Sequence, residues 1–584
     1  MAASVGNNTT LLERYPELFF HLNYTPFTPH QEDLQGQVLE ELHLEGVDLL
    51  YVYGIGLGHP YVALKSWLHE KRERRLIFLE EDLAVFHALL EAECAEELLL
   101  DPQVVVQFIS HPSLLQVKLD ELISLFPCDR IEVACLLSYR KKYRRRFQKI
   151  RLHLLRRSTL AHSLLTESLY SHKMLKHLLR NIKRWDGSFF AGGLRGKFRG
   201  IPAIICGAGP SLQGSLEQLK SVEDKALIIA GGSTIAALSN QGIYPHLGLA
   251  LDPNPEEFDR LKVAAAYETP LIYATRLQPD VFNAVSGEWG YLVSDTGGPL
   301  ERHFEKEMGL DSEPIGPEMG AEALSITTLA IALAVQMGCD PIFLNGIDLA
   351  YTGMQRYAEG ILPSSHVHLP EIRLQTRASE RMLKRKNIQG HYVYTLVKWV
   401  MESECIAAFA ASHPQTRFIN VSAAGLGFSG IPNIPLAEAI ETHLMNPLDL
   451  RALVHAEIQR LKILPLHEKI ACEMQSVQES LVRLSGVAAA MIQELERVQA
   501  LAELPPLPTG KMAILEMDFQ EEKAFDCLFP TLGPALDKLL SRAFVPSLHS
   551  TEGEKERLML ACKLAKYKAW QEIIVSKIAV FSKI

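Results

Sequence analysis

The chain has 584 residues, of which 47% are hydrophobic and 22% charged, as in a soluble globular protein of two to four domains. The formal net charge of −10 argues against a general nucleic-acid-binding protein. No apolar run is long enough to span a membrane, and the first ten residues lack the basic-then-apolar pattern of a signal peptide, so we expect neither.

The number and spacing of the cysteines indicate the redox state of the cellular compartment. The nine cysteines are scattered, with no CxxC pair and no zinc-ligand spacing. We therefore expect reduced, mostly buried thiols and a cytoplasmic protein.

The first predicted domain covers residues 1–185 and is a small Rossmann-like α/β domain. Apolar runs that alternate with helical patterns predict a parallel sheet: the run that opens "GVDLLYVYGIGLGHPYVALKSWL", then "RRLIFLEED", "VVVQFIS" and "RIEVACLLS". Gly54, Gly56 and Gly58 follow the first run, and Glu80 or Glu81 closes the second. This spacing imitates a dinucleotide or S-adenosylmethionine site, although tight turns without a cofactor show it too.

A strongly basic segment, "RKKYRRRFQKIRLHLLRR", occupies residues 140–157 and leads into a helical connector. One interpretation is the solvated face of a linking helix. The other is a patch that makes peripheral contact with an acidic partner or an anionic membrane surface.

The second predicted domain covers residues 186–440 and is a doubly wound parallel sheet. Its seven strand candidates are "IPAIICG", "KALIIAGG", "HLGLALD", "PLIYATR", "GYLVSD", "DPIFLNGID" and "RFINVS". Near-continuous apolar strands followed by small-residue turns are typical of a sheet whose two faces are both covered. Residues 441–584, the third predicted domain, are mostly helical and contain no recognisable chemical motif.

The stretch "IICGAGPSL" places Gly207 and Gly209 directly after a predicted strand, where ligands bind in open parallel sheets. Glycines tolerate positive φ and let a ligand approach backbone N–H groups. Pro210 suits the first turn of a helix, and Ser211 adds a hydroxyl at the helix N-terminus, where anions are favoured. The pattern is typical of a loop that binds phosphate. The alternative is a tight strand-to-helix turn that contributes only to packing.

Other polar residues follow neighbouring strands or begin a neighbouring helix. Asp252 and Asn254 lie in "LALDPNP", where prolines end the regular structure. Ser325 precedes an apolar helix, and its hydroxyl could either cap that helix or bind an anion.

Another polar loop is "FLNGIDLAYTGMQRYAEG", which contains several candidate binding residues. Asn345, Gly346 and Asp348 end the strand, and Tyr351 and Tyr357 follow. Polar clusters at several strand ends favour a binding site over simple packing.

The ordered motifs "GAGPSL", "LALDPNP" and "GCDPIFLNGIDLAYTG" resemble the motility associated factor family of bacterial glycosyltransferases. That family shares its domain type with 6-hydroxymethylpterin diphosphokinase-like proteins. The motifs are also similar to those of bacterial sialyltransferases that use CMP-sialic acid. The resemblance covers residues 190–435 best and implies a Rossmann-like, GT-A-type glycosyltransferase fold.

The resemblance also implies roles for individual residues. Residues 207–211 would hold the nucleotide phosphates or ribose, and Asp252 or Asn254 would contact the nucleotide or the donor sugar. Ser325 would lie near the sugar or the cytidine. Tyr351 and Tyr357 keep the six-residue spacing of the sialyltransferase tyrosines that bond the leaving phosphate, although Ala350 is an extra residue before the first.

An inverting transfer also needs a base for the acceptor hydroxyl, and histidine suits neutral pH. The candidates are His366, His368, His391 and His413. His391 is favoured because "GHYVYTLVKWV" resembles a sialyltransferase segment in which Gly-His precedes a helix, although an exposed loop histidine is the alternative. The glycine-rich residues 421–436 either cover the donor or end the domain.

Phenolic hydroxyls can stabilise a leaving phosphate without a metal, so no cofactor is obligatory. Asp348 could still hold Mg²⁺, or it could be a structural cap.

Three functions follow from these observations. The first is transfer of a nonulosonic-type sugar from a CMP-activated donor to a protein or glycan hydroxyl. The second is diphosphokinase chemistry on a pterin alcohol with ATP and magnesium, for which Asp252 and Asp348 are the carboxylate pair. The third is a non-enzymatic scaffold that retains the fold.

Overall fold

The computed structural model describes residues 11–26, 38–39, 42–169, 171–294, 296–319, 325–359, 361, 366–530, 532–544 and 551–584. The chain divides into two compact units. Unit 1 comprises residues 1–167, 367–385 and 394–401, and unit 2 comprises residues 168–366, 386–393 and 402–584. Each unit is built around its own parallel sheet.

Unit 1 contains a four-stranded parallel sheet in the order β3-β2-β1-β4. Alternate side chains of β1, such as Leu50 and Tyr51, enter two separate apolar clusters, so both faces of the sheet are covered. The strands are β1 (Leu49–Tyr53), β2 (Arg75–Glu80), β3 (Val104–Phe108) and β4 (Ile131–Cys135). The helices that begin in this unit are α2 (Pro16–Tyr24), α3 (His59–His69), α4 (Leu83–Leu90), α5 (Ala95–Leu100), α6 (Leu115–Leu125), α7 (Leu137–Lys142), α8 (Arg144–Leu169), α15 (Leu369–Arg373) and α16 (Val397–Ser412), with 3-10 turns η1 (Pro112–Leu114) and η7 (Ala378–Glu380).

The later segments of unit 1 bond directly to the edge strand of its sheet. Arg381 donates to the backbone carbonyl of Ile131 and to the Glu132 carboxylate, each at 2.7 Å. The N–H of Ile131 donates to the carbonyl of Thr376. Ala378, Val397 and Met401 belong to the apolar cluster on one face of this sheet. Unit 1 is therefore discontinuous in sequence.

Unit 2 contains an eight-stranded sheet in the order β14-β11-β6-β7-β8-β9-β10-β5, in which every neighbouring pair is parallel. After β6 the chain fills the sheet in one direction, and β11 then pairs on the other side of β6. The boundary between β6 and β11 is therefore the topological switch point, where such sheets bind ligands. The strands are β5 (Phe189–Phe190), β6 (Ala203–Cys206), β7 (Leu227–Gly231), β8 (Leu247–Ala250), β9 (Leu271–Tyr273), β10 (Trp289–Tyr291), β11 (Ile342–Asn345) and β14 (Phe418–Asn420).

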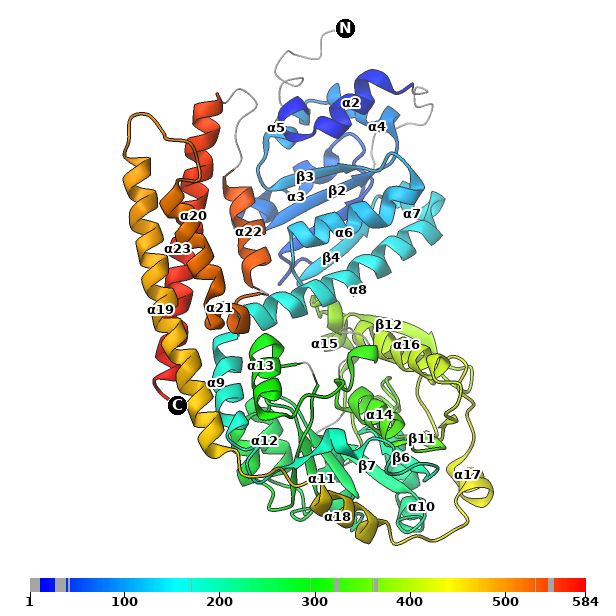
Figure 1. Ribbon diagram of the computed structural model, residues 1–584. Helices are drawn as coiled ribbons and strands as arrows, with labels where there is room; N and C mark the ends of the chain where they lie inside the picture. Colours follow the sequence, from blue (N-terminus) through cyan, green and yellow to red (C-terminus); the bar gives the residue numbers. More distant parts are fainter. Residues whose placement is uncertain are drawn as a thin grey trace. The chain divides into compact units, whose positions relative to one another are not determined.

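Helices cover both faces of this larger sheet (Figure 1). Alternate side chains of β6 point to opposite faces, with Ile204 in one cluster and Ile205 in the other. α14 (Ile326–Met337) packs across β6, β7, β8 and β11 on the second face. The other helices and 3-10 turns between α9 and α18 are α9 (Ser171–Ile182), η2 (Ala191–Leu194), η3 (Pro210–Ser215), α10 (Leu216–Lys220), α11 (Ser233–Ser239), α12 (Pro255–Leu261), η4 (Pro279–Asn283), α13 (Gly298–Met308), η5 (Pro317–Met319), α17 (Leu436–His443) and α18 (Leu450–Arg460).

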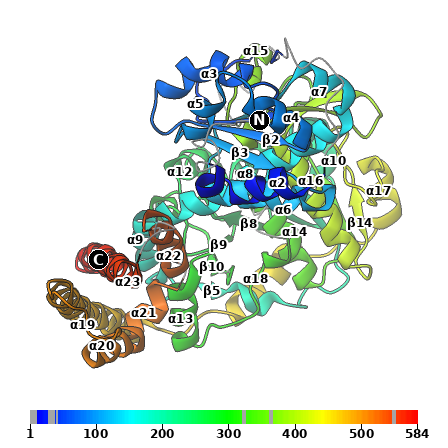
Figure 2. The ribbon, with the colours of Figure 1, turned by 90° about the horizontal axis from the view of Figure 1, so that it is seen from above.

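The C-terminal helices pack along one another, and Figure 2 shows the two longest, α19 and α23, almost end-on. Trp570 of α23 and Leu481 of α19 belong to the same apolar cluster as Tyr291 of the sheet, so these helices share its core. The helices are α19 (His467–Gln499), α20 (Gly510–Glu521), α21 (Lys523–Leu528), α22 (Leu532–Ala543) and α23 (Glu552–Phe581).

The predicted α/β architecture with parallel sheets and a helical C-terminal region is confirmed. All eleven predicted strands are present, whereas β5 and the hairpin of β12 (Met382–Lys386) and β13 (Tyr392–Leu396) were not predicted. The division into three domains at residues 185 and 440 stays a prediction. All nine cysteines are free, but only four are buried, so the expectation that most are buried was wrong. Along the described ranges, no helix is both long and apolar enough to cross a bilayer.

A first prediction concerns close packing in the larger sheet. A Cβ on Gly290 of β10 would lie 2.2 Å from the ring of Phe189, which is fully buried. Gly290→Ala should therefore destabilise the protein by about 1–3 kcal/mol, measured as a lower Tm. Gly486→Ala is the control, because this exposed position within α19 has no neighbour within 4 Å and should gain about 0.5–1 kcal/mol. Equal Tm changes in the two variants would contradict the packing argument.

Candidate functional site

The loops that follow β6 and β11 are bonded to each other at the switch point. The N–H of Gly207 donates to the carbonyl of Asn345 at 2.8 Å, and the N–H of Gly209 donates to that of Gly346 at 2.7 Å. A Cβ on Gly207 or Gly209 would lie 2.6 Å from the Gly346 carbonyl oxygen. Neither glycine has a positive φ, so a left-handed backbone, which the sequence suggests, is not the reason for glycine here. Glycine is required because the loop after β11 approaches too closely for a Cβ.

Ser211 and Asp348 bond these two loops together. The hydroxyl of Ser211 donates to Asp348 Oδ1, and its backbone N–H donates to Oδ2 at 3.1 Å. Asp348 is buried, which raises the pKa of its carboxyl, while the bonds from Ser211 and Thr352 oppose that shift. The protein's own carboxylate therefore lies where the sequence predicts a phosphate. Pro210 starts a 3-10 turn rather than an α-helix.

Asp252 and Asn254 form a compact turn before α12. Asp252 Oδ1 accepts from the backbone N–H and the side-chain amide of Asn254, at 2.9 and 2.8 Å. Its Oδ2 lies 3.6 Å from the Arg260 guanidinium. Asp252 is thus connected to Arg260, which lines the cavity described below.

The two tyrosines lie on the segment that returns from β11 toward β6. Tyr351 is buried and Tyr357 is half-buried. The N–H of Ala358 donates to the carbonyl of Ala208 at 2.9 Å, which places Tyr357 one residue away from a contact with the turn after β6. The Arg356 guanidinium lies 5.4 Å from the Tyr357 ring centroid.

Ser325 caps α14, which is one of the two roles that the sequence predicts for it. Its hydroxyl accepts from the N–H of Thr328, and the Thr328 hydroxyl accepts from the N–H of Ser325. Ser325 also donates to the Glu402 carboxylate at 2.6 Å. Its bonds are therefore made within the protein.

His391 lies in the exposed turn of the β12–β13 hairpin. Its backbone N–H donates to Asn387 Oδ1 at 2.9 Å. Strand β13 follows His391, and α16 begins directly after that strand, so the helix follows the Gly-His pair with one short strand between them. His366 forms an isolated bridge with Gln355, and His368 precedes α15. His413 lies 3.4 Å from the Glu318 carboxylate. The role of His391 as the base stays a prediction.

The glycine-rich segment 421–436 packs on the loop that carries Asp348. The N–H of Leu426 donates to the Asp348 carbonyl at 2.8 Å, and Gly425 has φ +103°. A Cβ on Gly425 would lie 2.4 Å from the Asp348 carbonyl oxygen. The hairpin turn bonds to the same segment, because the N–H of Ile388 donates to the Gly425 carbonyl.

A cavity of about 130 Å³ opens beside these loops, at the carboxyl ends of β6 and β7. It is bounded by the turns after these two strands, by one side of α12 and by the first turns of α14. The lining residues are Cys206, Ala208, Gly231, Gly232, Ser233, Thr234, Glu257, Arg260, Ile326, Thr327 and Ala330. The first N–H groups of α14 have no acceptor within the helix, and the Ser325 hydroxyl takes only that of Thr328.

Glu257 and Arg260 are the charged residues that line this cavity, and the sequence did not point to either of them. The Glu257 side chain is fully buried, and its Oε1 has no hydrogen-bond partner among the described residues. Oε2 lies 3.5 Å from the Arg260 guanidinium. Burial, and then the neighbouring charge of Asp252, raise the pKa of Glu257 to about 7, although Arg260 lowers it.

The sequence carried a partial signal for this cavity. "GGST" follows a predicted strand, and "PEEFDR" continues the predicted Asp252 loop into a helix. The spacing of Glu257 and Arg260, three residues apart on α12, places both on one helix face. The cavity that they line also needs α14, which is distant in sequence, so the chain alone could not show that they face a cavity.

The carboxylates do not fit a magnesium site. Both oxygens of Asp348 accept from Ser211, and those of Asp252 face Asn254 and Arg260. Within the described ranges, no three His, Cys, Asp or Glu side chains gather as ligands for a metal ion.

The glycine-rich loop of unit 1 is held by Glu80. The Glu80 carboxylate is fully buried and accepts from the backbone N–H groups of Ile55, Glu81 and Asp82 and from the Tyr139 hydroxyl. A cofactor at this loop would need an acidic residue that faces outward at the end of β2. Glu80 faces the loop instead, and Glu81 pairs with Arg146.

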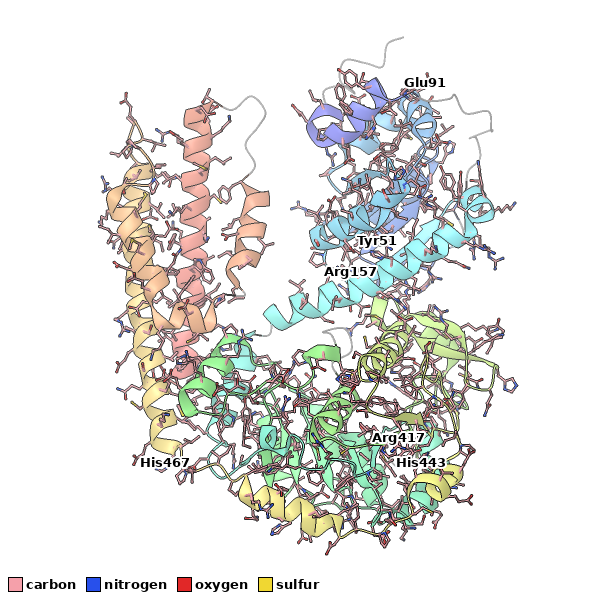
Figure 3. All side chains as sticks on the ribbon, turned by 45° about the vertical axis from the view of Figure 1, so that its right-hand side comes forward. Tyr51, Glu91, Arg157, Arg417, His443 and His467 are labelled. Carbon is pink, nitrogen blue, oxygen red and sulfur yellow. The ribbon has the colours of Figure 1, made fainter. Side chains whose placement is uncertain are left out.

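The basic segment 140–157 lies on α7 and α8, where Figure 3 labels Arg157. Arg146 pairs with Glu81 at 2.7 Å, and Arg157 pairs with Asp120 at 3.0 Å. Part of the segment thus serves unit 1 itself. Contact with a membrane or an acidic partner stays a prediction.

The fold and the cavity define an α/β protein with a polar cavity at the carboxyl edge of a parallel sheet. Residues 176–354 match the family model described as 6-hydroxymethylpterin diphosphokinase MptE-like, which confirms the domain type inferred from the motifs. The chain is similar to the MAf glycosyltransferase from Magnetospirillum magneticum AMB-1, at 13% identity and a TM-score of 0.47, over 99% of this chain and 96% of that one. No curated protein matches the sequence.

The bond between Ser211 and Asp348 gives a second prediction. Ser211→Ala removes a donor to a buried carboxyl and should cost about 1–3 kcal/mol, measured as a lower Tm. Ser221→Ala, at an exposed serine that donates to the Gln218 carbonyl, should stay within about 0.5 kcal/mol. An unchanged Tm for Ser211→Ala, together with lost nucleotide binding, would instead make Ser211 a ligand contact.

The raised pKa of Glu257 gives a third prediction. Because the folded protein holds the Glu257 proton more tightly than the unfolded chain, this group disfavours folding increasingly as pH rises from about 4.5 through 7. Glu257→Gln removes that penalty, so its stability relative to wild type should increase from pH 5 to pH 8 by up to about 3 kcal/mol. Urea unfolding at both pH values measures the difference. A difference that does not change with pH would show that Glu257 does not titrate in this range.

Proposed function

We propose that the chain is a glycosyltransferase that binds the phosphate of a nucleotide-activated sugar in the cavity beside β6 and β7. The donor is a CMP-activated, nonulosonic-type sugar, and the acceptor is a protein or glycan hydroxyl. The proposal includes a Rossmann-like, GT-A-type central domain and a cytoplasmic location.

The observation that carries the proposal is that Arg260 and the first turn of α14 line the same cavity. A guanidinium and the free N–H groups of a 12-residue helix both favour an anion. The cavity adjoins the switch point, where open parallel sheets bind ligands. The buried and unpartnered Glu257 Oε1 is a second sign that a ligand belongs there.

The residues predicted from the motifs support this position. Asp252 contacts Arg260, Ala208 lines the cavity, and Ala358 bonds to Ala208 beside Tyr357. We propose that Tyr357 and Tyr351 donate hydrogen bonds to the leaving phosphate as the sugar–phosphate bond breaks. Hydrogen-bond donors aimed at the developing charge lower the barrier without a metal. His391 takes the acceptor proton in this proposal.

The second candidate is pyrophosphoryl transfer to a pterin alcohol, which the family match over residues 176–354 favours. That reaction uses ATP and magnesium, and the metal needs carboxylate oxygens free to bind it. Asp348 and Asp252, the predicted pair, already accept bonds from Ser211 and Asn254. The glycosyltransferase is therefore the better supported candidate.

Calorimetry separates the candidates. CMP and a CMP-activated sugar should bind the full-length protein, whereas ATP with Mg²⁺ should bind much more weakly. Tighter binding of ATP with Mg²⁺, together with AMP release from a hydroxymethylpterin substrate, would favour the diphosphokinase. No binding of any nucleotide would favour a scaffold.

The fourth prediction tests the position of the phosphate. Arg260→Gln should weaken CMP binding at least about tenfold, because a charge-assisted bond to the phosphate is lost. Arg417→Gln is the matched control, since Arg417, labelled in Figure 3, pairs with Asp340 at the amino ends of β11 and β14. It should leave the affinity unchanged. Equal losses in both variants, or none in Arg260→Gln, would place the phosphate elsewhere.

A further inference from the structure

The charges around the cavity are not balanced for an anionic ligand. One cation, Arg260, lies 3.6 Å from Asp252 and 3.5 Å from Glu257. With both carboxyls ionised, this group carries one net negative charge. A phosphate that entered would meet repulsion from Glu257, whose Oε1 has no hydrogen-bond donor to offset its charge.

Among the described residues that line the cavity, none besides Arg260 could supply the missing positive charge. From β6 the titratable group at the cavity is the buried Cys206 thiol, whose pKa burial raises to about 12. The described residues of α11 and α14 carry no charged side chain, and the acid on η4, Asp280, is exposed and accepts from Gln278. The charge state of the site therefore rests on Asp252, Glu257 and Arg260.

We propose that an anionic ligand enters this cavity together with one proton, which Glu257 holds on Oε1 and donates as a hydrogen bond to the ligand. The proton comes from solvent and moves to the carboxylate, and no bond of the ligand breaks. The protonated acid turns a repelling group into a donor beside Arg260 and leaves the three side chains neutral overall. This rests on the proposed function only in taking the ligand to be a phosphate-bearing molecule.

The consequence is binding that depends on pH. Burial holds the pKa of Glu257 near 7 in the free protein, so one proton is bound with the ligand at pH 8 and little is needed at pH 6. Above pH 7 the affinity should fall by up to about tenfold per pH unit. Such a site releases its ligand when the surroundings become alkaline.

The experiment is calorimetric titration of CMP into wild type, Glu257→Gln and Glu256→Gln at pH 6, 7 and 8. Two buffers with different ionisation enthalpies report proton uptake. Glutamine keeps an N–H donor but cannot ionise, so the ratio of wild-type to Glu257→Gln affinity isolates this group and cancels the titration of the CMP phosphate. Glu256 is the exposed neighbour on α12 and serves as the control.

We expect the affinity of wild type and of Glu256→Gln to fall about fivefold relative to Glu257→Gln between pH 7 and pH 8, with nearly one extra proton taken up at pH 8. Binding of CMP with the same pH dependence in all three proteins would overturn this proposal and leave the proposed function standing. Absence of CMP binding at every pH would count against the proposed function, and inorganic pyrophosphate would then be titrated in the same way. The same variant-dependent ratio with pyrophosphate would support the proposal, and no binding or an unchanged ratio would overturn it.

Discussion

The bond between Ser211 and Asp348 joins the two loops that meet at the switch point of the larger sheet. The turn after β6 and the loop after β11 are far apart in sequence, and they meet only because β6 and β11 are parallel neighbours. Two glycines let their backbones touch, and one buried carboxylate accepts both donors of Ser211. This junction fixes one wall of the switch point, and the glycine-rich segment 421–436 packs on its other side.

Much of this fold could be predicted from the sequence, since apolar runs that end in small residues mark strands buried on both faces. The short β5 and the hairpin β12–β13 were missed because two residues make too short a pattern and the hairpin carries charged residues. The strand-end loops were located correctly, but what each polar residue faces depends on its partner. Ser211 pairs with Asp348, whereas Glu257 lines a cavity whose walls come from segments that only the folded chain brings together.

The family match and the cavity coincide. Every lining residue, from Cys206 to Ala330, falls within residues 176–354, as do Asp252, Asp348 and Tyr351. Tyr357, His391 and the glycine-rich segment lie outside it. The cavity proposed to bind an anion thus lies within the matched domain, while Tyr357 and the proposed base His391 lie in the residues that follow it.

The discontinuity of unit 1 has a consequence for how the protein is made. Its edge strand β4 bonds to Arg381 and Thr376, and its apolar cluster includes Val397 and Met401. A ribosome must therefore translate all of residues 168–366 before the first unit can complete its core. At about 5–20 residues per second, the nascent residues 1–167 wait on the order of ten seconds or more with one apolar cluster incomplete, which is the interval in which a chaperone would be most useful.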